Sequence, residues 1–245
     1  MKKNIKYLLS FSPYGLYEIF RDNTIHAKRI KNQMVIIDNY LENYDVRKMQ
    51  IGCGSNILEG WLNTDLNDSD EIAFLDAGGK FPISDETFDY IYSEHLFEHL
   101  KVEQQVNMLQ ESFRILKKGG VMRIATPTLD FLFDLYNKPE SLENKDYVDY
   151  YISCFPQFKK VNELVFDKEE HYNYVINNFF KAWGHQMIHN FSSIKKLALQ
   201  CNYTQVRQAK VGESDILFLQ DIEKHGCIIP ERINKIETMV VEIIK

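Results

Sequence analysis

The stretch "MQIGCGSNILEGWLNTDLN", residues 49–67, decides the fold of this chain of 245 residues. An apolar segment that ends at Ile51 runs into the glycine turn "GCGSN", and "WLNTDLN" then forms a second apolar segment that ends at an acid, Asp65. Glycine at Gly52 and Gly54 permits backbone angles that are closed to other residues and lets a ligand approach the chain. The order of strand, glycine turn, strand and acid predicts a ligand site where the strands of a sheet end.

The glycine turn matches neither of the common nucleotide-binding loops. A dinucleotide fingerprint requires a third glycine at position 57, which is Ile57 here, so NAD and FAD are disfavoured. A phosphate-binding loop would contain Gly-Lys followed by Ser or Thr, and this turn does not. The turn by itself is weak evidence, so the segments around it decide its meaning.

Strand and helix patterns alternate after this stretch. Short apolar strands are predicted at "EIAFLDAGG", "FDYIYS" and "VMRIATP", which are residues 71–79, 88–93 and 121–127. Between the last two, apolar residues recur at helical spacing from Val106, and "LKKGG" ending at Gly120 is a typical helix stop. This alternation predicts an α/β fold with a doubly wound, Rossmann-like and mostly parallel sheet.

Three further segments complete the domain organisation. Residues 1–46 carry no motif and are interpreted as an N-terminal accessory segment, while residues 47–245 form one domain with an insertion at about 128–190. The insertion is helical and rich in aromatic residues, and it is either a lid over the substrate or an addition that only enlarges the core. Apolar residues recur at helical spacing from Ile233 to Ile244 and predict an amphipathic C-terminal helix.

The composition excludes several classes of protein. The formal net charge is −6 and the pI is about 5.7, without a block of Lys or Arg, which argues against nucleic acid as a partner. The four cysteines form no Cys-x-x-Cys pair, so a disulfide framework is disfavoured and a cytoplasmic location is expected. No signal peptide is evident, and no apolar run is long enough to predict a membrane span. The oligomeric state stays open, a homo-oligomer included.

A second stretch, "SEHLFEHL" at residues 93–100, has two interpretations. Its segment from His95 to His99 matches H-x-x-E-H, the signature of an inverted zinc protease. That interpretation needs one long helix and a further acid, for which Glu169 or Glu170 would have to serve, and it leaves the glycine turn unexplained. The preferred interpretation is the end of a strand and the turn after it, which predicts no metal site.

Two acids end successive strands beside the glycine turn. Asp65 could accept bonds from both hydroxyls of a ribose, and Asp76 could accept one from an exocyclic amine. Aspartate is common in loops and caps, but two acids at successive strand ends are less readily dismissed.

This ordered set of motifs resembles the class I S-adenosylmethionine-dependent methyltransferases, specifically their type 11 group. The matching stretches are "MQIGCGSNILEGWLNTDLN", "FLDAGGKFPISDETFDYIYSEHLFEHL" and "ESFRILKKGGVMRIATP", and they cover roughly residues 48–127. The resemblance implies S-adenosylmethionine as the cofactor, bordered by Gly52, Gly54, Asp65, Leu66, Asp76, Ala77, Ser93 and His95. The interval from Gly54 to Asp65 is short, so the family's usual helix between them is expected to be nearly absent.

The resemblance also implies a reaction, methyl transfer by in-line displacement, in which the enzyme positions and desolvates two reactants. If the acceptor is a hydroxyl, a base helps to remove its proton, and His185 and His95 are the candidates. The pattern, including "WGH" and "GES", is similar to family members from bacterial surface-polysaccharide pathways. This implies O-methylation of a sugar or other small-molecule hydroxyl in glycan biosynthesis. A non-catalytic cofactor-binding module stays the alternative, ahead of a zinc-dependent hydrolase.

Overall fold

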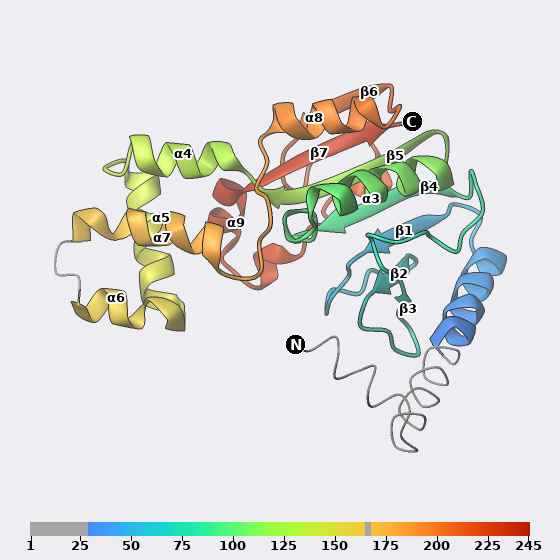
Figure 1. Cartoon of the computed structure of the whole chain (residues 1–245), viewed down its shortest axis with the longest axis horizontal. Coiled ribbons are helices and arrows are strands. Elements are labelled where there is room, and N and C mark those ends of the chain that lie inside the picture. The colour runs from blue at the N-terminus through green and yellow to red at the C-terminus, as the bar shows by residue number, and fades with distance from the viewer. Residues whose placement is uncertain (1–28, 165–167) are drawn as a thin grey trace, which may run out of the picture.

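The computed structural model describes residues 29–164 and 168–245, which form a seven-stranded sheet flanked by helices (Figure 1). The strands are β1 (Lys48–Ile51), β2 (Leu62–Asp65), β3 (Ala73–Phe74), β4 (Phe88–Glu94), β5 (Leu116–Pro127), β6 (Gln205–Ala209) and β7 (Thr238–Ile244). Their order in the sheet is β3-β2-β1-β4-β5-β7-β6. Strands β1 to β5 pair in parallel, and β7 runs antiparallel between β5 and β6. This confirms the predicted doubly wound, mostly parallel α/β fold.

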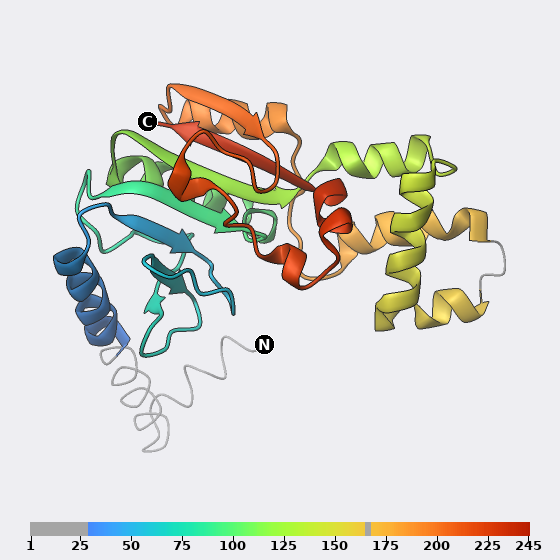
Figure 2. The ribbon, with the colours of Figure 1, turned by 180° about the vertical axis from the view of Figure 1, so that it is seen from behind.

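The centre of the sheet is buried on both faces, which explains why its strands are continuous apolar runs in the sequence. Met49 of β1 pairs with Leu62 of β2 on one side and with Ile91 of β4 on the other, and all three are buried. Helices α3 (Val102–Ile115) and α8 (Phe191–Gln200) lie on one face of the sheet (Figures 1 and 2). A loop between β6 and α9 packs on the other face through Leu219 and Ile222.

The connection from β1 to β2 contains no helix, as the short interval between its motifs predicts. A helix at residues 29–43 packs on the strands instead, with Ile37 and Tyr40 in the core that α3 and α8 share. Residues 1–28 of the predicted accessory segment lie outside the described residues. None of the helices in the described ranges is both long enough and apolar enough to cross a membrane. All four cysteines are free.

The predicted helix stop at "LKKGG" is confirmed, but the stretch itself is a strand and not a turn. Helix α3 ends at Ile115, and residues 116–120 belong to β5. Gly119 N donates to Lys245 O at 3.1 Å, and Lys245 N donates to Gly120 O at 3.0 Å. These bonds to the last residue of the chain extend the sheet over a segment that local sequence marks as a turn.

The predicted amphipathic C-terminal helix is wrong. Only α9 (Glu231–Glu237) is helical, and the residues after it form β7. The β-branched residues of "MVVEII" favour a strand, and a place between β5 and β6 buries both of its faces. Glu242 of β7 accepts bonds from Arg123 of β5 and Arg207 of β6, each at 2.7 Å, so the one acid in this apolar run is paired.

The aromatic insertion forms a helical lobe beyond the carboxyl ends of β4 and β5 (Figures 1 and 2). Its helices are α4 (Leu129–Asn137), α5 (Leu142–Cys154), α6 (Lys159–Leu164) and α7 (His171–Lys181). They enclose an apolar core of their own, in which Phe131, Tyr147, Tyr151 and Phe179 are buried. Short 3-10 turns complete the described chain: η1 (Phe97–His99), η2 (Pro156–Phe158), η3 (Lys168–Glu170), η4 (Leu217–Leu219) and η5 (His225–Cys227). A role of the lobe as a lid stays a prediction.

Candidate cofactor and active site

The two glycines of the turn after β1 have left-handed backbones for different reasons. Gly52 has φ +71°, and a Cβ added there would lie 2.7 Å from Leu96 Cδ2, closer than side chains pack. Gly54 has φ +53°, and its added Cβ would meet nothing within 4 Å. Gly52 therefore lets the turn pack against the segment that follows β4, while Gly54 presents bare backbone to open space, where a ligand can approach it.

Asp65 lies directly against this turn, as the sequence predicts. Its Oδ2 accepts a bond from Gly54 N at 3.0 Å, and its Oδ1 accepts one from Asn67 N at 2.9 Å. Parallel pairing of β1 with β2 produces this contact, because both strands end at the same edge of the sheet. The next residue, Leu66, is 56% exposed. A carboxylate, a backbone amide and an exposed apolar side chain thus meet beside Gly54.

Asp76 and Ala77 follow β3 at the same edge of the sheet. Leu75 N donates to Asp65 O at 2.9 Å, which fixes the end of β3 beside the end of β2. Asp76 is exposed, and its Oδ1 accepts a bond from Gly78 N at 2.8 Å, while Ala77 is buried. The two acids therefore end neighbouring strands, and the outer one faces solvent.

Ser93 and His95 lie at the end of β4. Ser93 is fully buried, and its Oγ has no hydrogen-bond partner among the described residues. His95 has a left-handed backbone with φ +46°, which is strained for a residue with a side chain. Its ring stacks on that of His225 with centroids 3.8 Å apart. The strained turn thus aims the imidazole back across the end of the sheet.

Both ring nitrogens of His95 have partners. Nε2 lies 3.3 Å from Thr238 Oγ1, and Nδ1 lies 3.3 Å from Glu98 Oε1, a long contact that is better described as an ion pair than as a directed hydrogen bond. Burial acts to lower the pKa of His95, but the neighbouring Glu98 outweighs it, and the pKa is raised. His95 is thereby favoured in its protonated form.

Glu98, in η1, is the buried centre of this part of the site. Its Oε2 accepts a bond from Thr126 Oγ1 at 2.9 Å, whereas its Oε1 has no hydrogen-bond partner among the described residues. Burial acts to raise the pKa of Glu98, but the contacts with His95 and His99 lower it overall. A buried, ionised carboxylate therefore faces two imidazoles. The sequence signal for it was "SEHLFEHL", which we interpreted only as a turn.

The structure brings His185 to the same carboxylate. Trp183 and Gly184 have φ +57° and φ +81°, and the loop then docks through Gln186 N, which donates to Glu98 O at 2.7 Å. His185 Nδ1 lies 2.7 Å from Phe179 O, so this nitrogen carries the proton and Nε2 keeps its lone pair. Burial lowers the pKa of His185 and favours the neutral ring.

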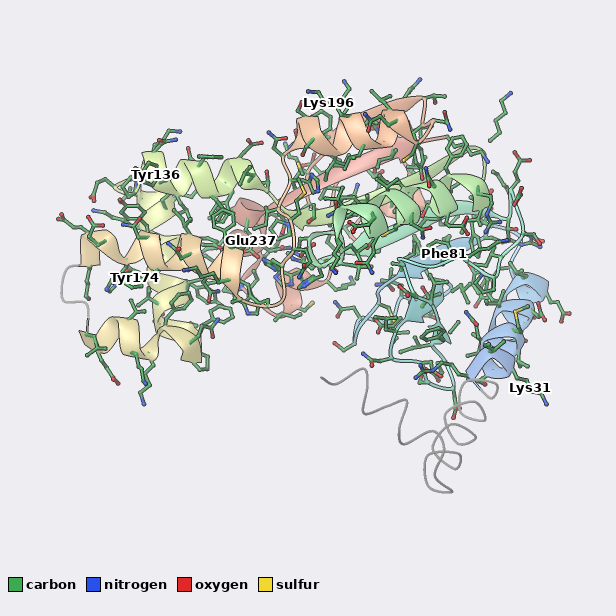
Figure 3. All side chains as sticks on the ribbon, in the orientation of Figure 1. Lys31, Phe81, Tyr136, Tyr174, Lys196 and Glu237 are labelled. Atoms are coloured by element: carbon green, nitrogen blue, oxygen red, sulfur yellow. The ribbon has the colours of Figure 1, made fainter. Side chains whose placement is uncertain are left out.

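Sequence reasoning missed a second buried carboxylate, Glu237 at the end of α9. It lies where the helical lobe meets the sheet (Figure 3). Its Oε2 accepts bonds from the hydroxyls of Tyr147 and Tyr151 of α5, the latter at 2.6 Å, and its Oε1 lies 3.3 Å from His225 Nε2. No local pattern marks this residue, because its partners are far away along the chain.

Two groups of three side chains could hold a metal ion among the described residues. One consists of His95, His225 and Glu237, and the other of Glu98, His99 and His185. Neither includes Glu169 or Glu170, which the inverted zinc-protease interpretation requires. His95 also precedes η1, a single 3-10 turn that ends at His99, so the motif does not form the long helix of that interpretation.

Part of the chain matches a known protein family. Residues 61–124, which span β2 to β5, match the model of a family described as a methyltransferase domain. The fold is similar to that of an S-adenosylmethionine-dependent methyltransferase from Archaeoglobus fulgidus, at 17% identity over 96% of this chain and 100% of that one, with a TM-score of 0.46. Another from Mesorhizobium loti is 11% identical over 82% of this chain and 91% of that one, with a TM-score of 0.44.

A third similar structure is a methyltransferase from Haloferax volcanii, solved in complex with its activator Trm112. It is 14% identical over 91% of this chain and 93% of that one, with a TM-score of 0.44. No curated protein matches the chain in sequence. At these identities and TM-scores the solved structures carry no argument about this chain, and the family match over β2 to β5 is the comparison that bears on activity.

Proposed function

We propose that this chain is an S-adenosylmethionine-dependent methyltransferase, which its family match and strand order support, and that it methylates the hydroxyl of a sugar or other small molecule in glycan biosynthesis. The observation that carries the choice of a hydroxyl is His185, a neutral imidazole with a free Nε2 lone pair at the carboxyl edge of the sheet. A hydroxyl must lose a proton during methyl transfer, and such an imidazole can take it.

The cofactor would lie along the ends of β1 to β4. Gly54 and Asp65 fit its binding, because bare backbone faces open space there and a carboxylate lies where ribose hydroxyls could donate to it. Asp76 and Ala77, with Leu66, would border the adenine, and Gly52, Ser93 and His95 the methionine part. The bound cofactor supplies a methyl group on a sulfonium. The protein's share is to hold the acceptor oxygen in line with it and to exclude water.

The structure favours His185 over His95 as the proton acceptor. Both ring nitrogens of His95 have partners, and its raised pKa favours the imidazolium, which cannot accept a proton. His185 Nδ1–H donates to a backbone carbonyl, which fixes the ring orientation and leaves Nε2 as the basic atom. The C–S bond breaks and the C–O bond forms while the hydroxyl proton moves to this Nε2.

A sugar acceptor is supported by the aromatic residues around His185. Trp183 is 42% exposed, and its ring packs edge-on against Phe155 and Phe179 of the helical lobe. An exposed indole held in place by other rings offers a rigid apolar face on which a sugar ring can stack. This supports the lid interpretation of the lobe at its inner end.

A mass-spectrometric screen of candidate glycans and metabolites tests the proposal, with purified chain and S-adenosylmethionine. We expect a methyl group to be added to a hydroxyl of at least one sugar. His185→Ala should lose most of that activity, and His95→Ala, which removes a protonated ring, should lose less. Cofactor binding without turnover on any acceptor would instead favour the non-catalytic module. Methylation of nitrogen or carbon only would refute the choice of acceptor.

A further inference from the structure

Two groups at the site each contain two histidines and one glutamate, and they differ in whether their ligand atoms can point at one ion. His95 and His225 are stacked, with an interplanar angle of 27° and centroids 3.8 Å apart. The lone pairs of an imidazole lie in its ring plane, so two stacked rings direct theirs along nearly parallel planes. Stacked rings therefore converge on one ion less readily than crossed rings do, and the group with Glu237 is the weaker of the two candidates.

The rings of the other group have the opposite arrangement. His99 and His185 meet edge to face at 71°, with centroids 4.8 Å apart. Their planes intersect, so one point can lie in both. Glu98 Oε1 lies 3.8 Å from His99 Nε2, and the three ligand atoms lie within 4.8 Å of one another. Because zinc bonds to nitrogen and oxygen are about 2.0–2.2 Å long, two ligands of one ion lie up to about 4 Å apart. Small side-chain rotations would therefore bring the three ligand atoms close enough to bind one ion.

The surroundings of Glu98 and His185 are those of metal ligands. Glu98 Oε1 is buried and has no hydrogen-bond partner in the described chain, while Thr126 holds the other carboxylate oxygen. A metal-binding histidine normally donates its second ring N–H to a carbonyl or carboxylate, which orients the ring. His185 does so to Phe179 O at 2.7 Å. Two ligands are thus oriented in advance. Glu98 Oε1 makes only ion-pair contacts, with His95 Nδ1 at 3.3 Å and His99 Nε2 at 3.8 Å, which leaves it a lone pair for an ion.

We propose that Glu98, His99 and His185 form a binding site for one divalent transition-metal ion of the zinc class. Two imidazoles and one carboxylate leave a fourth coordination position open, as in catalytic zinc sites. The side chain of His99 is 33% exposed, so the ion can enter from solvent. This site shares only two residues with the H-x-x-E-H motif, and its third ligand comes from a loop 86 residues beyond His99. Such a site differs from the sequence-based expectation of no metal, and a direct binding measurement decides between the two.

The inference deepens the proposed function, on which its chemical consequence rests. With the ion bound, His185 Nε2 would be a metal ligand and could not be the proton acceptor, a role that it keeps only in the metal-free chain. A hydroxyl at the open position would then lose its proton to water, because the cation stabilises the alkoxide. Metal binding itself requires neither the cofactor nor an acceptor, so it can be measured whether or not the chain methylates a hydroxyl.

The test is direct metal binding to the full chain after chelator treatment. We expect about one Zn²⁺ per chain by elemental analysis and calorimetry, and Co²⁺ to give the intense visible absorption of a tetrahedral site. His99→Ala and Glu98→Gln should each weaken Zn²⁺ binding by at least tenfold to a hundredfold, the loss typical even of a removed outer partner. His225→Ala, which belongs to the stacked group, is the matched control and should bind as tightly as the native chain.

Three results would overturn the metal site. They are no Zn²⁺ or Co²⁺ binding by the native chain, equal binding by the native chain and His99→Ala, and loss of binding in His225→Ala alone. Thermal unfolding of each variant shows whether it is folded. If His99→Ala is unstable, Glu98→Gln serves in its place, because glutamine keeps the shape of the side chain. Zinc binding without hydroxyl methylation would refute only the proposed function, and methylation that survives complete metal removal would refute only the chemical consequence.

Discussion

Alanine at the two turn glycines should separate a packing role from a ligand-binding role. In Gly52→Ala, the new methyl would lie 2.7 Å from Leu96 Cδ2 and 3.2 Å from its Cβ, so the Leu96 side chain must leave its packed position and the contact with its Cβ stays tight. The left-handed backbone costs about 1–2 kcal/mol for a residue with a Cβ. Overpacking of this kind adds about 1–3 kcal/mol. In Gly54→Ala only the backbone cost applies, because the methyl enters open space.

Thermal unfolding measures the loss of stability in each glycine variant, and calorimetry measures its affinity for S-adenosylmethionine. For a chain of this size, each kcal/mol corresponds to about 2–4 °C in Tm. We therefore expect a loss of about 4–20 °C in Gly52→Ala and of about 2–8 °C in Gly54→Ala. Cofactor affinity should fall by more than about tenfold, or 1.4 kcal/mol, in Gly54→Ala, because its methyl occupies the approach to the backbone.

A double variant checks the physical cause. Adding Leu96→Ala to Gly52→Ala removes the contacts with the two Leu96 Cδ atoms but keeps the left-handed backbone and the contact with Cβ, so the two changes should be coupled by about 1–3 kcal/mol. Equal Tm losses in the two glycine variants, with no coupling to Leu96, would refute the packing argument. Unchanged cofactor affinity in Gly54→Ala would remove the turn from the cofactor site.

Three further predictions concern single side chains. Asp65→Ala should weaken cofactor binding by about 2 kcal/mol through lost charge-assisted bonds, and calorimetry with an unchanged affinity would exclude this acid from the site. His185→Ala should lower turnover by roughly a hundredfold to ten-thousandfold and leave cofactor affinity nearly intact, whereas a histidine that only packs would lower Tm and spare the rate. Glu111→Gln should cost about 1 kcal/mol at neutral pH, because the bond from Arg114 lowers the pKa of Glu111 and part of this pair is exposed to solvent. Because the pKa of Glu111 is lower in the folded chain, its carboxylate stabilises the fold at pH values above its unfolded pKa of about 4.3. This contribution is lost as the pH falls through the pKa of Glu111 in the folded chain. Urea titrations of the native chain and Glu111→Gln should therefore give the same free energy of unfolding at low pH.

The sequence alone was enough to predict the sheet and the turn beside it. Alternating apolar runs and turns are local signals, and strands of a parallel sheet end at one edge, so Gly54 and Asp65 could be expected to meet. Their 3.0 Å contact agrees with that expectation. The short interval between them likewise predicted a connection without a helix, because a full helix does not fit into it.

The C-terminal segment shows where local pattern fails. Its apolar residues fit a helical period and a strand equally well, and only the free place between β5 and β6 selects the strand. Arg123 of β5 and Arg207 of β6 donate to the Glu242 carboxylate and so offset the cost of burying its charge in β7. The sequence of a short segment does not show which strands it will pair with. Tertiary packing against β5 and β6 therefore determined that this segment is a strand.

Thus the sequence by itself determined the α/β fold, the order of its motifs and the edge of the sheet at which a ligand would lie. Only the tertiary structure decided which side chains face one another at that edge. His185 reaches Glu98 because two left-handed residues turn its loop back, and Glu237 meets Tyr147 because α9 packs against the helical lobe. Polar groups so far apart in the chain meet only after the backbone between them has folded, and burial then strengthens the contacts between them.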